Sequence, residues 1–424
     1  MKGNPPPSPR TVEETGLDPG FLLDHMLRTI RRLGGETVTE IAGRLHVAPG
    51  VIEALIEAAR ESKLIQPLGA RGANVAAELR YELTETGRAR AVSAFEACAW
   101  VGPAPVPHRQ FVEQIGRQSI RAERIDRDRL EEALRGLTLS ERVVQAVGPA
   151  ANSAASMLLY GPPGNGKSSI ARAIAHAFRD VVFIPYAVEL DREVIALYDA
   201  TVHQAAPVMR PESGLRLTLG FDKRFVVCRR PVVSTGGELT LDMLDLAYNP
   251  ASRIYEAPLQ LKAAGGVFVI DDFGRQREAP QALVNRWIVP LERHVDYLTL
   301  RTGRKLETPF DTLVIFSTNI PPRELVDEAA LRRIRHKIEI APPGRDQFLR
   351  IMAETCRERG VEIDEASLAY LLAALYAAEG KGFAAFHPGF LLDQIEAIAA
   401  YEGVEPRLDP DFLRRAWLNL HTTA

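Results

Sequence analysis

The spacing of apolar residues predicts a helical first quarter, followed by a centre of short apolar strands. Residues 1–19 are rich in proline and show neither a helical nor a strand period, so we expect a disordered tail. From Phe21 onward, apolar residues recur three and four positions apart, as in helices that bury one face. The elements predicted for this quarter are helices from Phe21 to Gly34, over 37–45 and over 49–62, extended pieces near 64–68 and 79–83, and a helix over 84–99.

Three helices, a hairpin and a trailing helix resemble a winged helix-turn-helix, which we therefore predict for residues 20–100. The third helix would read DNA, yet it presents Glu53, Glu57 and Glu61 on one face against a single Arg60. Carboxylates that face phosphates oppose binding, so contact with a protein is the favoured interpretation. Binding to DNA stays as the alternative, because the first helix and the wing hold several arginines, which are Arg28, Arg31, Arg32, Arg71 and Arg80.

Residues 101–129 are predicted to form a linker into the central region. Its first part, Val101–Pro107, is stiffened by prolines at alternate positions. Arginines interleaved with acids follow, and this mixture is typical of a solvated, salt-bridged helix face rather than of a nucleic-acid surface. These arginines are Arg121, Arg124, Arg127 and Arg129.

One strand, one glycine-rich turn and one helix organise the centre of the chain. Met157–Tyr160 is a short apolar run that predicts a buried strand, and residues 168–179 place apolar side chains four apart on one helical face. Between them lies Gly161-Pro-Pro-Gly-Asn-Gly-Lys-Ser168, which fits the G-x-x-x-x-G-K-S pattern of a phosphate-binding loop in its required context. The sequence therefore predicts a site for a nucleoside triphosphate.

The chemistry of this loop follows from its residue types. Glycines let successive backbone N–H groups turn toward phosphate oxygens, and the helix N-terminus adds its partial positive charge. Lys167 can reach the β- and γ-phosphates, and the Ser168 hydroxyl can ligate Mg²⁺. The residues predicted to bind the nucleotide are Gly161, Pro162, Pro163, Gly164, Asn165, Gly166, Lys167, Ser168 and Ser169.

Two later strands end in polar side chains that suit the same site. Val267–Ile270 is followed by Asp271, which would hold Mg²⁺ through water, and by Asp272, which would orient or deprotonate the attacking water. A strand over 312–318 precedes Asn319, an amide suited to hydrogen-bond the γ-phosphate or the water. An amide at a strand end is often a turn-former, but this one would lie at the edge that holds the nucleotide, which favours function.

Three arginines follow a helix start at Asp327. Arg332, Arg333 and Arg335 could form a solvated face, or they could reach the γ-phosphate of a neighbouring subunit and stabilise charge in the transition state. We take Arg332 and Arg333 as the candidates for this catalytic role and Arg335 as the fallback.

The residues between the phosphate loop and the two acids are less regular. We predict a second strand over 181–185 and a helix from about 192 to 204. Residues 206–262 show strand character near 215–228 and a helical stretch over 240–248, and residues 254–260 lead into the next strand. They offer no nucleophile and base at a catalytic spacing. We interpret this stretch as an inserted element that contacts a partner.

The four motifs Gly161–Ser168, Val267–Asp272, Val314–Asn319 and Leu331–Arg335 resemble, in this order, the Walker A, Walker B, sensor 1 and arginine-finger regions of AAA+ ATPases. The resemblance implies a P-loop α/β core with a parallel sheet over residues 130–343 and a C-terminal helical lid over 344–424. It also implies Mg²⁺-dependent ATP hydrolysis and a homo-oligomeric ring, such as a hexamer. More loosely, the whole chain resembles bacterial predicted ATPases with chaperone activity that are associated with Flp pilus assembly.

Two positions depart from the family pattern. Family members usually carry glutamate where this chain has Asp272, and the shorter side chain can slow hydrolysis. The arginine of sensor 2 would fall near Phe386-His-Pro-Gly-Phe-Leu, where Gly389 takes its place, so we assign no sensor 2 residue.

Composition narrows the classes of function. The chain has 424 residues, a net charge of −3 and three cysteines far apart, which argue against a nonspecific polyanion binder and against a disulfide framework. No apolar run is long enough to span a bilayer, and the start lacks a signal peptide, so we expect a cytoplasmic protein. The leading hypothesis is an ATP-driven remodeller of an unknown protein substrate. The alternatives are a DNA-bound regulator that uses the winged helix and a nucleotide-gated scaffold that hydrolyses ATP slowly.

Overall fold

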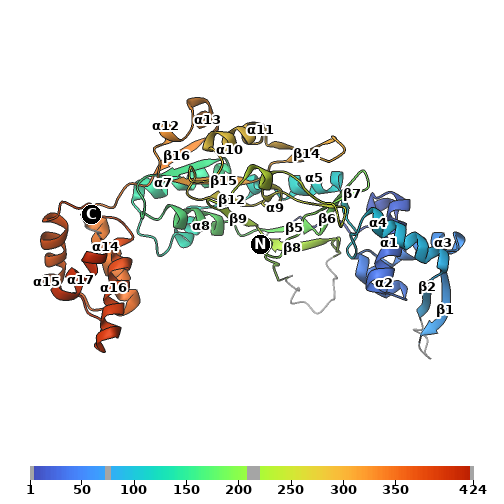
Figure 1. Ribbon diagram of the computed structural model, residues 1–424, viewed down its shortest axis with the longest axis horizontal. Helices are drawn as coiled ribbons and strands as arrows, with labels where there is room; N and C mark the ends of the chain where they lie inside the picture. Colours follow the sequence, from blue (N-terminus) through green and yellow to red (C-terminus); the bar gives the residue numbers. More distant parts are fainter. Residues whose placement is uncertain (1–3, 72–77, 208–219, 421–424) are drawn as a thin grey trace.

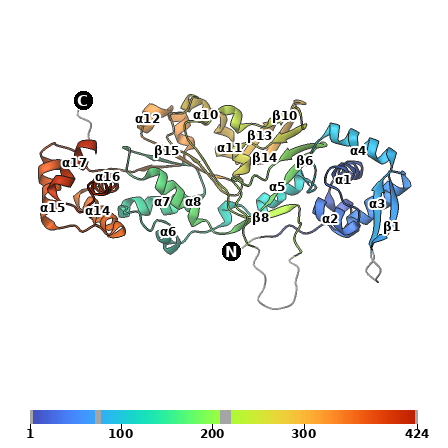
Figure 2. The ribbon, with the colours of Figure 1, turned by 60° about the horizontal axis from the view of Figure 1, so that its bottom comes forward.

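The computed structural model describes residues 4–71, 78–207 and 220–420. The molecule is elongated: an N-terminal helical module lies at one end, an α/β core in the middle, and a C-terminal helical domain at the other end (Figure 1). A second view, turned about the long axis, shows the same succession of three parts (Figure 2).

The N-terminal module contains the elements that the apolar spacing predicts, in the predicted order. Its helices begin at capping side chains, since Asp18 accepts the N–H of Phe21, Thr37 that of Glu40, and Thr84 that of Gly87. Apolar faces of the helices form one buried core with the start of the hairpin. The elements are α1 (Pro19–Leu33), α2 (Val38–Leu45), α3 (Pro49–Glu61), β1 (Ile65–Arg71), β2 (Glu78–Leu83) and α4 (Glu85–Ala97).

The expectation of a disordered tail is wrong for residues 4–17. Val12 and Leu17 are buried in the core of the N-terminal module, and Thr15 is fully buried. The N–H of Asp222 donates to the carbonyl of Pro6 at 2.9 Å, so this segment also lies against a distant part of the chain. Proline-rich composition lowers the entropy lost on ordering, and partners far away in sequence supply the contacts that composition does not show.

The core is built on a five-stranded parallel sheet with the order β16-β4-β15-β12-β9. Alternate side chains enter two cores: Met157 and Leu159 pack with α6, α7 and α8, whereas Leu158 packs on the opposite face with α10, α11 and α13. Both faces are therefore covered, which explains the unbroken apolar strands. The strands are β4 (Met157–Tyr160), β9 (Val232–Thr235), β12 (Val267–Ile270), β15 (Leu313–Thr318) and β16 (His336–Glu339); the helices are α6 (Arg127–Ala133), α7 (Glu141–Ser153), α8 (Lys167–Ala177), α10 (Pro280–Arg286), α11 (Ile288–Arg293) and α13 (Glu328–Arg333).

The predicted second strand exists but does not belong to this sheet. It is β5 (Val181–Pro185), which pairs antiparallel with β8 (Phe225–Arg229), and β9 takes the position next to β12 instead. The predicted helix over 192–204 is wrong. Asp191 and Arg192 adopt positive φ angles in a tight turn between β6 (Ala187–Leu190) and β7 (Glu193–Ala196), where the β-branched Val194 and Ile195 are buried in a strand.

The strands β6 and β7 belong to a second five-stranded sheet with the order β10-β11-β7-β6-β3. Its other members are β3 (Val106–Pro107), β10 (Ala247–Asn249) and β11 (Ile254–Glu256), none of which the sequence analysis predicted as a strand. The predicted helix over 240–248 shortens to the single turn η3 (Leu241–Leu244), because the next residues pair in β10. Part of the strand expected near 215–228 lies outside the described residues.

Glu123 marks the place where the chain leaves the parallel sheet and returns to it. Its carboxylate accepts the N–H of Arg179 at 2.7 Å, just after α8, and the Nε of Arg230 at 2.6 Å, just before β9. Arg129 donates to the same carboxylate at 2.7 Å. Burial opposes ionisation of Glu123, but these hydrogen bonds lower its pKa below the usual range. Arg127 pairs with Glu131 at the surface, as the mixed charge pattern predicts. Arg129 instead pairs with the buried Glu123, and Arg121 donates to Nδ1 of His294.

A hairpin that the sequence did not predict precedes β15. Its strands are β13 (Val295–Thr299) and β14 (Lys305–Pro309), and Leu298 and Leu306 are buried against the second sheet and α5 (His108–Arg117). The short helices α9 (Leu259–Lys262) and α12 (Pro322–Leu325) complete the core.

The C-terminal helical domain has a core of its own, centred on Phe348, Tyr376 and Trp417. Its elements are α14 (Arg345–Arg359), α15 (Glu365–Tyr370), the π-helical η4 (Leu371–Ala377), α16 (His387–Glu402) and α17 (Pro410–Leu420). Among the residues described, no helix has the length and apolar character needed to cross a bilayer.

Candidate functional site

The carboxyl ends of three neighbouring parallel strands bring the predicted site residues together. The register pairs Tyr160 with Thr318 and Ile270 with Phe316, so the phosphate loop, Asn319 and the two acids begin at the same edge of the sheet. Open parallel sheets bind ligands at this edge.

The loop backbone uses its glycines as the sequence predicts. Gly161, Gly164 and Gly166 have φ angles of 142°, 75° and 83°, in the region that side chains disfavour. A Cβ on Gly161 would lie 2.3 Å from the carbonyl oxygen of Ile340, so the close approach of β16 also requires glycine there. Helix α8 starts immediately afterwards at Lys167, and its free N–H groups face the loop.

Lys167 is held inside this loop and is only 6% exposed. Its ammonium donates to the carbonyl oxygens of Gly161 at 2.9 Å and Pro162 at 2.8 Å, and to Oδ1 of Asn319 at 2.6 Å. Burial lowers the pKa of Lys167, while the carboxylates of Asp272 and Asp271 act in the opposite direction. A phosphate would be a stronger partner for this ammonium than neutral carbonyls are.

Asn319 connects the lysine to the second acid. Its Nδ2 donates to Oδ1 of Asp272 at 3.3 Å, so the three side chains form the chain Lys167–Asn319–Asp272. Asp272 has a φ of 46°, in the left-handed region that aspartate tolerates better than most residues. The two acids also contact each other in this turn, because Oδ1 of Asp271 accepts the backbone N–H of Asp272 at 3.1 Å.

A glutamine that the sequence analysis missed supports both acids. The side-chain amide of Gln276 donates to the carbonyl oxygens of Gly236, Asp271 and Asp272 at 3.2–3.3 Å. It therefore ties the turn after β12 to the end of β9. No local motif marks Gln276, because its partners are backbone atoms.

Oxygen donors for a metal come from two elements. The Ser168 hydroxyl lies at the start of α8 and the Asp271 carboxylate at the end of β12. Among the described residues there is no cluster of three or more histidine, cysteine or acidic side chains that could hold a metal by itself. This fits Mg²⁺, which binds through one or two protein oxygens together with phosphate oxygens.

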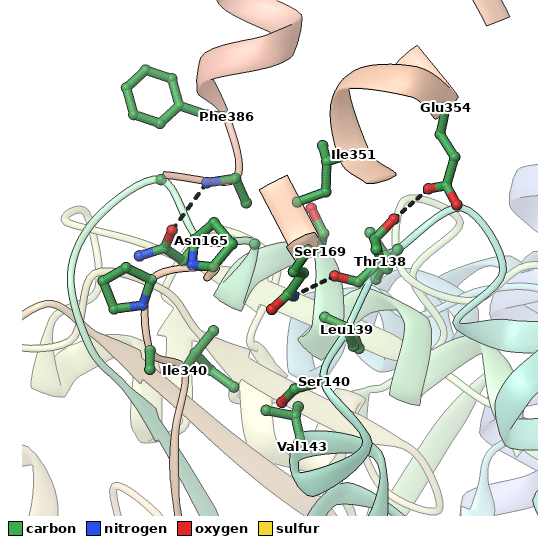
Figure 3. Close-up of a pocket in the computed structure, with 18 of the residues that line it drawn as sticks. Thr138, Leu139, Ser140, Val143, Asn165, Ser169, Ile340, Ile351, Glu354 and Phe386 are labelled. Carbon is green, nitrogen blue, oxygen red and sulfur yellow. Dashed lines mark hydrogen bonds between the residues drawn. The ribbon is translucent and has the colours of Figure 1, made fainter. Parts of the chain in front are cut away.

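A cavity of about 620 Å³ opens beside the loop, between the core and the C-terminal domain. Figure 3 shows Leu139, Val143 and Ile340 on the core side and Ile351 on α14, with Ser169 near the loop. Most of the lining comes from residues 136–143 and 339–343, which the sequence analysis did not single out. These stretches carry no sequence motif, and they mix apolar residues such as Leu139, Val143 and Ile340 with polar ones such as Thr138 and Arg142. Apolar walls next to a phosphate site suit the base and sugar of a nucleotide.

The arginines before β16 do not contact this loop within one chain. Arg332 has a side chain that is 77% exposed, with Glu328 at 3.7 Å, and Arg333 pairs with Glu292 at 2.9 Å. Arg335 is exposed as well. Gly389 lies in the first turn of α16, where an added Cβ would meet no atom within 4 Å.

Comparisons with known proteins agree with this geometry. Residues 157–207 match the model of the ATPase family associated with various cellular activities (AAA), and residues 344–419 match a domain of unknown function (DUF8689). Spastin from Anopheles gambiae is 23% identical over 261 residues, which are 62% of this chain and 25% of spastin. The chain thus spans about a quarter of the length of this curated relative.

The chain is similar to the solved structure of NtrX from Brucella abortus in complex with ATP, at 13% identity and a TM-score of 0.41 over 68% of this chain and 60% of NtrX. A RuvB mutant from Thermotoga maritima follows at 15% identity and a TM-score of 0.35, over 71% of this chain and 72% of RuvB. The AAA match covers the phosphate loop and its helix, and with the parallel sheet around them it supports the AAA+ superfamily for the core.

Proposed function

We propose that the protein binds and hydrolyses ATP and works as a homo-oligomeric ring that remodels a protein partner. The observation that supports this best is the chain Lys167–Asn319–Asp272, which joins the phosphate loop to the acids at one sheet edge. The adjacent cavity of about 620 Å³ has room for a nucleoside. We propose a cytoplasmic location for this activity.

The residues of the loop have distinct tasks in binding. The N–H groups of the loop and of the first turn of α8 bind phosphate oxygens, and Lys167 exchanges its carbonyl partners for the β- and γ-phosphates. Because Lys167 is buried and partly desolvated, its contact with a phosphate is stronger than one in water.

Hydrolysis depends on the metal-binding oxygens and on the polar residues that follow β12 and β15. Ser168 and Asp271 would hold Mg²⁺, which when bound neutralises charge on the phosphate oxygens. Asp272 accepts the proton of a water whose oxygen attacks the γ-phosphorus, while the bond from that phosphorus to the bridging oxygen breaks and ADP leaves. Asn319 holds the Asp272 carboxylate through Nδ2 and is positioned to contact the γ-phosphate.

The exposed arginines are the basis for the ring. Arg332 has only a weak contact within its own chain, so its guanidinium is free to enter the site of a neighbouring copy. Arg333 would have to leave Glu292 to do the same, which makes Arg332 the first candidate. Charge supplied in this way lowers the barrier to phosphoryl transfer.

The N-terminal module, which we take as a winged helix, favours a protein partner over DNA. Arg28 is 2% exposed and donates to the carbonyl of Trp100, and Arg80 pairs with Glu36 at 2.7 Å, so neither is available for phosphates. The Arg71 side chain lies outside the described residues, whereas Arg31 and Arg32 are exposed. Glu53, Glu57 and Glu61 are all exposed on α3, which opposes a DNA backbone. A nucleotide-gated scaffold that hydrolyses ATP slowly stays as the second candidate, because Asp272 is shorter than the usual glutamate. A link to Flp pilus assembly rests on sequence resemblance alone.

Two substitutions test the proposal. Lys167→Ala should weaken binding of a fluorescent ATP analogue by on the order of 100-fold, because charge-assisted hydrogen bonds to phosphate are lost. Asp272→Asn should bind the analogue normally and lose hydrolysis by on the order of 100-fold or more, measured as phosphate release. Normal binding by Lys167→Ala would overturn the proposal. Faster hydrolysis by Asp272→Glu than by the wild type would show that aspartate limits the rate and favour the scaffold.

A further inference from the structure

The C-terminal domain contacts the phosphate loop directly, through the residues that lead into α16. The N–H of Phe386 donates to the carbonyl oxygen of Gly164 at 2.9 Å, and the N–H of Ala385 donates to Oδ1 of Asn165 at 3.1 Å. The Phe386 ring packs on the loop, since a Cβ on Gly164 would lie 2.2 Å from its Cδ1. Figure 3 shows Asn165 directed at this segment of the C-terminal domain.

Asn165 is fixed on the loop side of this contact. It is 5% exposed, and its Nδ2 donates to the carbonyl oxygen of Pro162 at 3.3 Å. These two bonds assign the amide orientation, because only the oxygen can accept from Ala385 and only the nitrogen can donate to Pro162. A change in the loop backbone therefore moves the acceptor on which Ala385 depends.

The contact continues into the core of the C-terminal domain. The Phe386 ring meets the ring of His387 edge-on at 4.6 Å, and Nδ1 of His387 lies 2.7 Å from the Tyr376 hydroxyl. Tyr376 in turn packs on Trp417 with ring centroids 4.6 Å apart. These three residues are almost fully buried, whereas Phe386 itself is 45% exposed.

A charged side chain does not make this connection. Gly389 stands in the first turn of α16, and the loop is reached instead by two backbone N–H groups and an aromatic ring. Triphosphate binding needs the loop N–H groups turned toward the phosphates, which leaves the Gly164 carbonyl and the Asn165 side chain facing the C-terminal domain.

We propose that Asn165 and Phe386 are positioning residues that couple nucleotide occupancy of the phosphate loop to the orientation of the C-terminal helical domain. This inference rests on the proposed function, since it names how the same site reports its occupancy. Nucleotide orders the loop, and the ordered loop holds residues 385–386 and the start of α16. By linkage, the contact must strengthen nucleotide binding by the same factor as nucleotide strengthens the contact.

The test uses the full chain and four variants. Asn165→Ala removes the acceptor for Ala385, and Phe386→Ala removes the ring while keeping its backbone bond. Phe386→Leu restores apolar contact with the loop. Tyr401→Ala is the matched control, because this aromatic residue is 92% exposed at the other end of the same helix. Each protein is measured for affinity toward a fluorescent ATP analogue, for kcat and KM of ATP hydrolysis, and for hydrogen–deuterium exchange of residues 385–392 with and without a nonhydrolysable ATP analogue.

The wild type and Tyr401→Ala should show slower exchange at the start of α16 when the analogue is bound. Phe386→Ala and Asn165→Ala should lose that difference and bind the analogue about fivefold more weakly or worse, the lower range for coupled sites. Their kcat should fall as well, and Phe386→Leu should recover most of both effects. If Phe386→Ala keeps the full nucleotide-dependent protection of α16, the coupling is refuted. If the wild type itself does not bind the analogue, the proposed function fails first, and the two failures are thus distinguishable.

Discussion

The two ends of the molecule are joined to the core in different ways. The core of the N-terminal module includes Ala187 and Val194 from strands β6 and β7 of the second sheet, so its apolar interior continues into the α/β region. The apolar core of the C-terminal domain, in contrast, draws on residues 348–420 alone. Among the described residues, the hydrogen bonds that fasten this domain to the core come from Gln347, Glu354, Ala385 and Phe386, and all four border the cavity.

This difference indicates which of the two end domains a bound nucleotide can reorient. A domain with its own core and a few polar contacts around a ligand site can reorient without exposing apolar surface. A module that shares its core with the rest cannot move without opening that core. We therefore expect ATP to change the position of the C-terminal domain while the N-terminal module stays fixed, as a platform for the partner.

The largest effect is expected in the core, at Arg332 and Arg333, which we propose to serve a neighbouring copy. Arg332→Ala or Arg333→Ala should leave binding of a fluorescent ATP analogue nearly intact and lower hydrolysis by on the order of 10³-fold, because charge on the transferred phosphoryl group is no longer stabilised. Phosphate release as a function of protein concentration provides the measurement.

Mixing sharpens this test. An arginine variant has an intact nucleotide site, and Lys167→Ala has an intact arginine, so a mixture should regain part of the activity. Equal hydrolysis by a dilute monomeric wild type would contradict the ring, and if both substitutions are silent, Arg335 becomes the arginine to test.

The second-largest effect is expected where the N-terminal module is attached to the α/β core. Arg224 is buried in an ion pair with Asp222 at 2.8 Å and also donates to the carbonyl of Thr15 at 3.1 Å. Arg224→Ala leaves the Asp222 charge buried without its partner, so we expect a loss of about 3–5 kcal/mol in the free energy of unfolding. Denaturant titration measures this loss.

Arg192→Ala is the matched control, since its pair with Asp18 lies at the surface, with side chains 64% and 55% exposed. Such a pair contributes about 0–1 kcal/mol. Similar losses in both variants would show that the Arg224 network does not fasten the N-terminal module.

Acid should affect the two ends of the molecule differently, by an amount that grows gradually as the pH falls. Burial, together with the charge of Arg28, lowers the pKa of His25 to about 3, so the folded N-terminal module holds this histidine neutral. Its Nε2–H donates to the carbonyl of Gly102 at 2.9 Å, while Nδ1 faces Arg28 at 3.1 Å. The unfolded chain takes up a proton near pH 6.5, which the folded chain does not.

The contribution of His25 is therefore complete above about pH 6.5 and decreases by about 1.4 kcal/mol for each pH unit below it, until about pH 3. Hydrogen exchange followed from pH 7 to pH 4 should show the amides of α1 losing protection before those of α14 and α16. Equal loss at both ends would contradict a specific acid sensitivity of the N-terminal module.

The smallest effect concerns DNA. If the fixed N-terminal module is a platform for protein, the full chain should show no duplex binding that weakens steeply between low and moderate salt, since α3 presents Glu53, Glu57 and Glu61 to solvent. Fluorescence anisotropy with a labelled duplex at two salt concentrations measures this. Tight, salt-sensitive binding would instead favour a DNA-bound regulator.

The sequence predicted the phosphate side of the site because its chemistry is local. The glycine pattern, the lysine and the two strand ends can each be recognised from a few neighbouring residues. Apolar strands that form a parallel sheet then bring these residues to one edge. For the same reason the helices of the N-terminal module follow from apolar spacing, whereas those of the C-terminal domain were expected only from the family resemblance. In the structure Asn319 forms hydrogen bonds with both Lys167 and Asp272, at the sheet edge where the sequence analysis expected the site.

The remaining parts depend on partners that sequence spacing does not reveal. A helix was expected over 192–204, yet a turn with positive φ angles at Asp191 and Arg192 folds residues 187–196 into two strands of the second sheet. Residues 4–17 are ordered by contacts with residues near 222. The cavity wall over 136–143 consists of loop and helix start with no motif, so only the fold shows that it lies beside Gly166 and Ser169.

The carboxylate of Glu123 has a consequence for how the chain could have grown. Because it binds the backbone just after α8 and the arginine just before β9, the residues between them depart from one point and come back to it. Because residues 179 and 230 are held at the same carboxylate, the segment between them can be lengthened, shortened or exchanged for another sequence. The strand order of the parallel sheet is then kept. A chimera that joins residue 179 to residue 230 through a short glycine linker should retain the nucleotide site while losing strands β6 and β7 and, with them, Ala187 and Val194 of the N-terminal core.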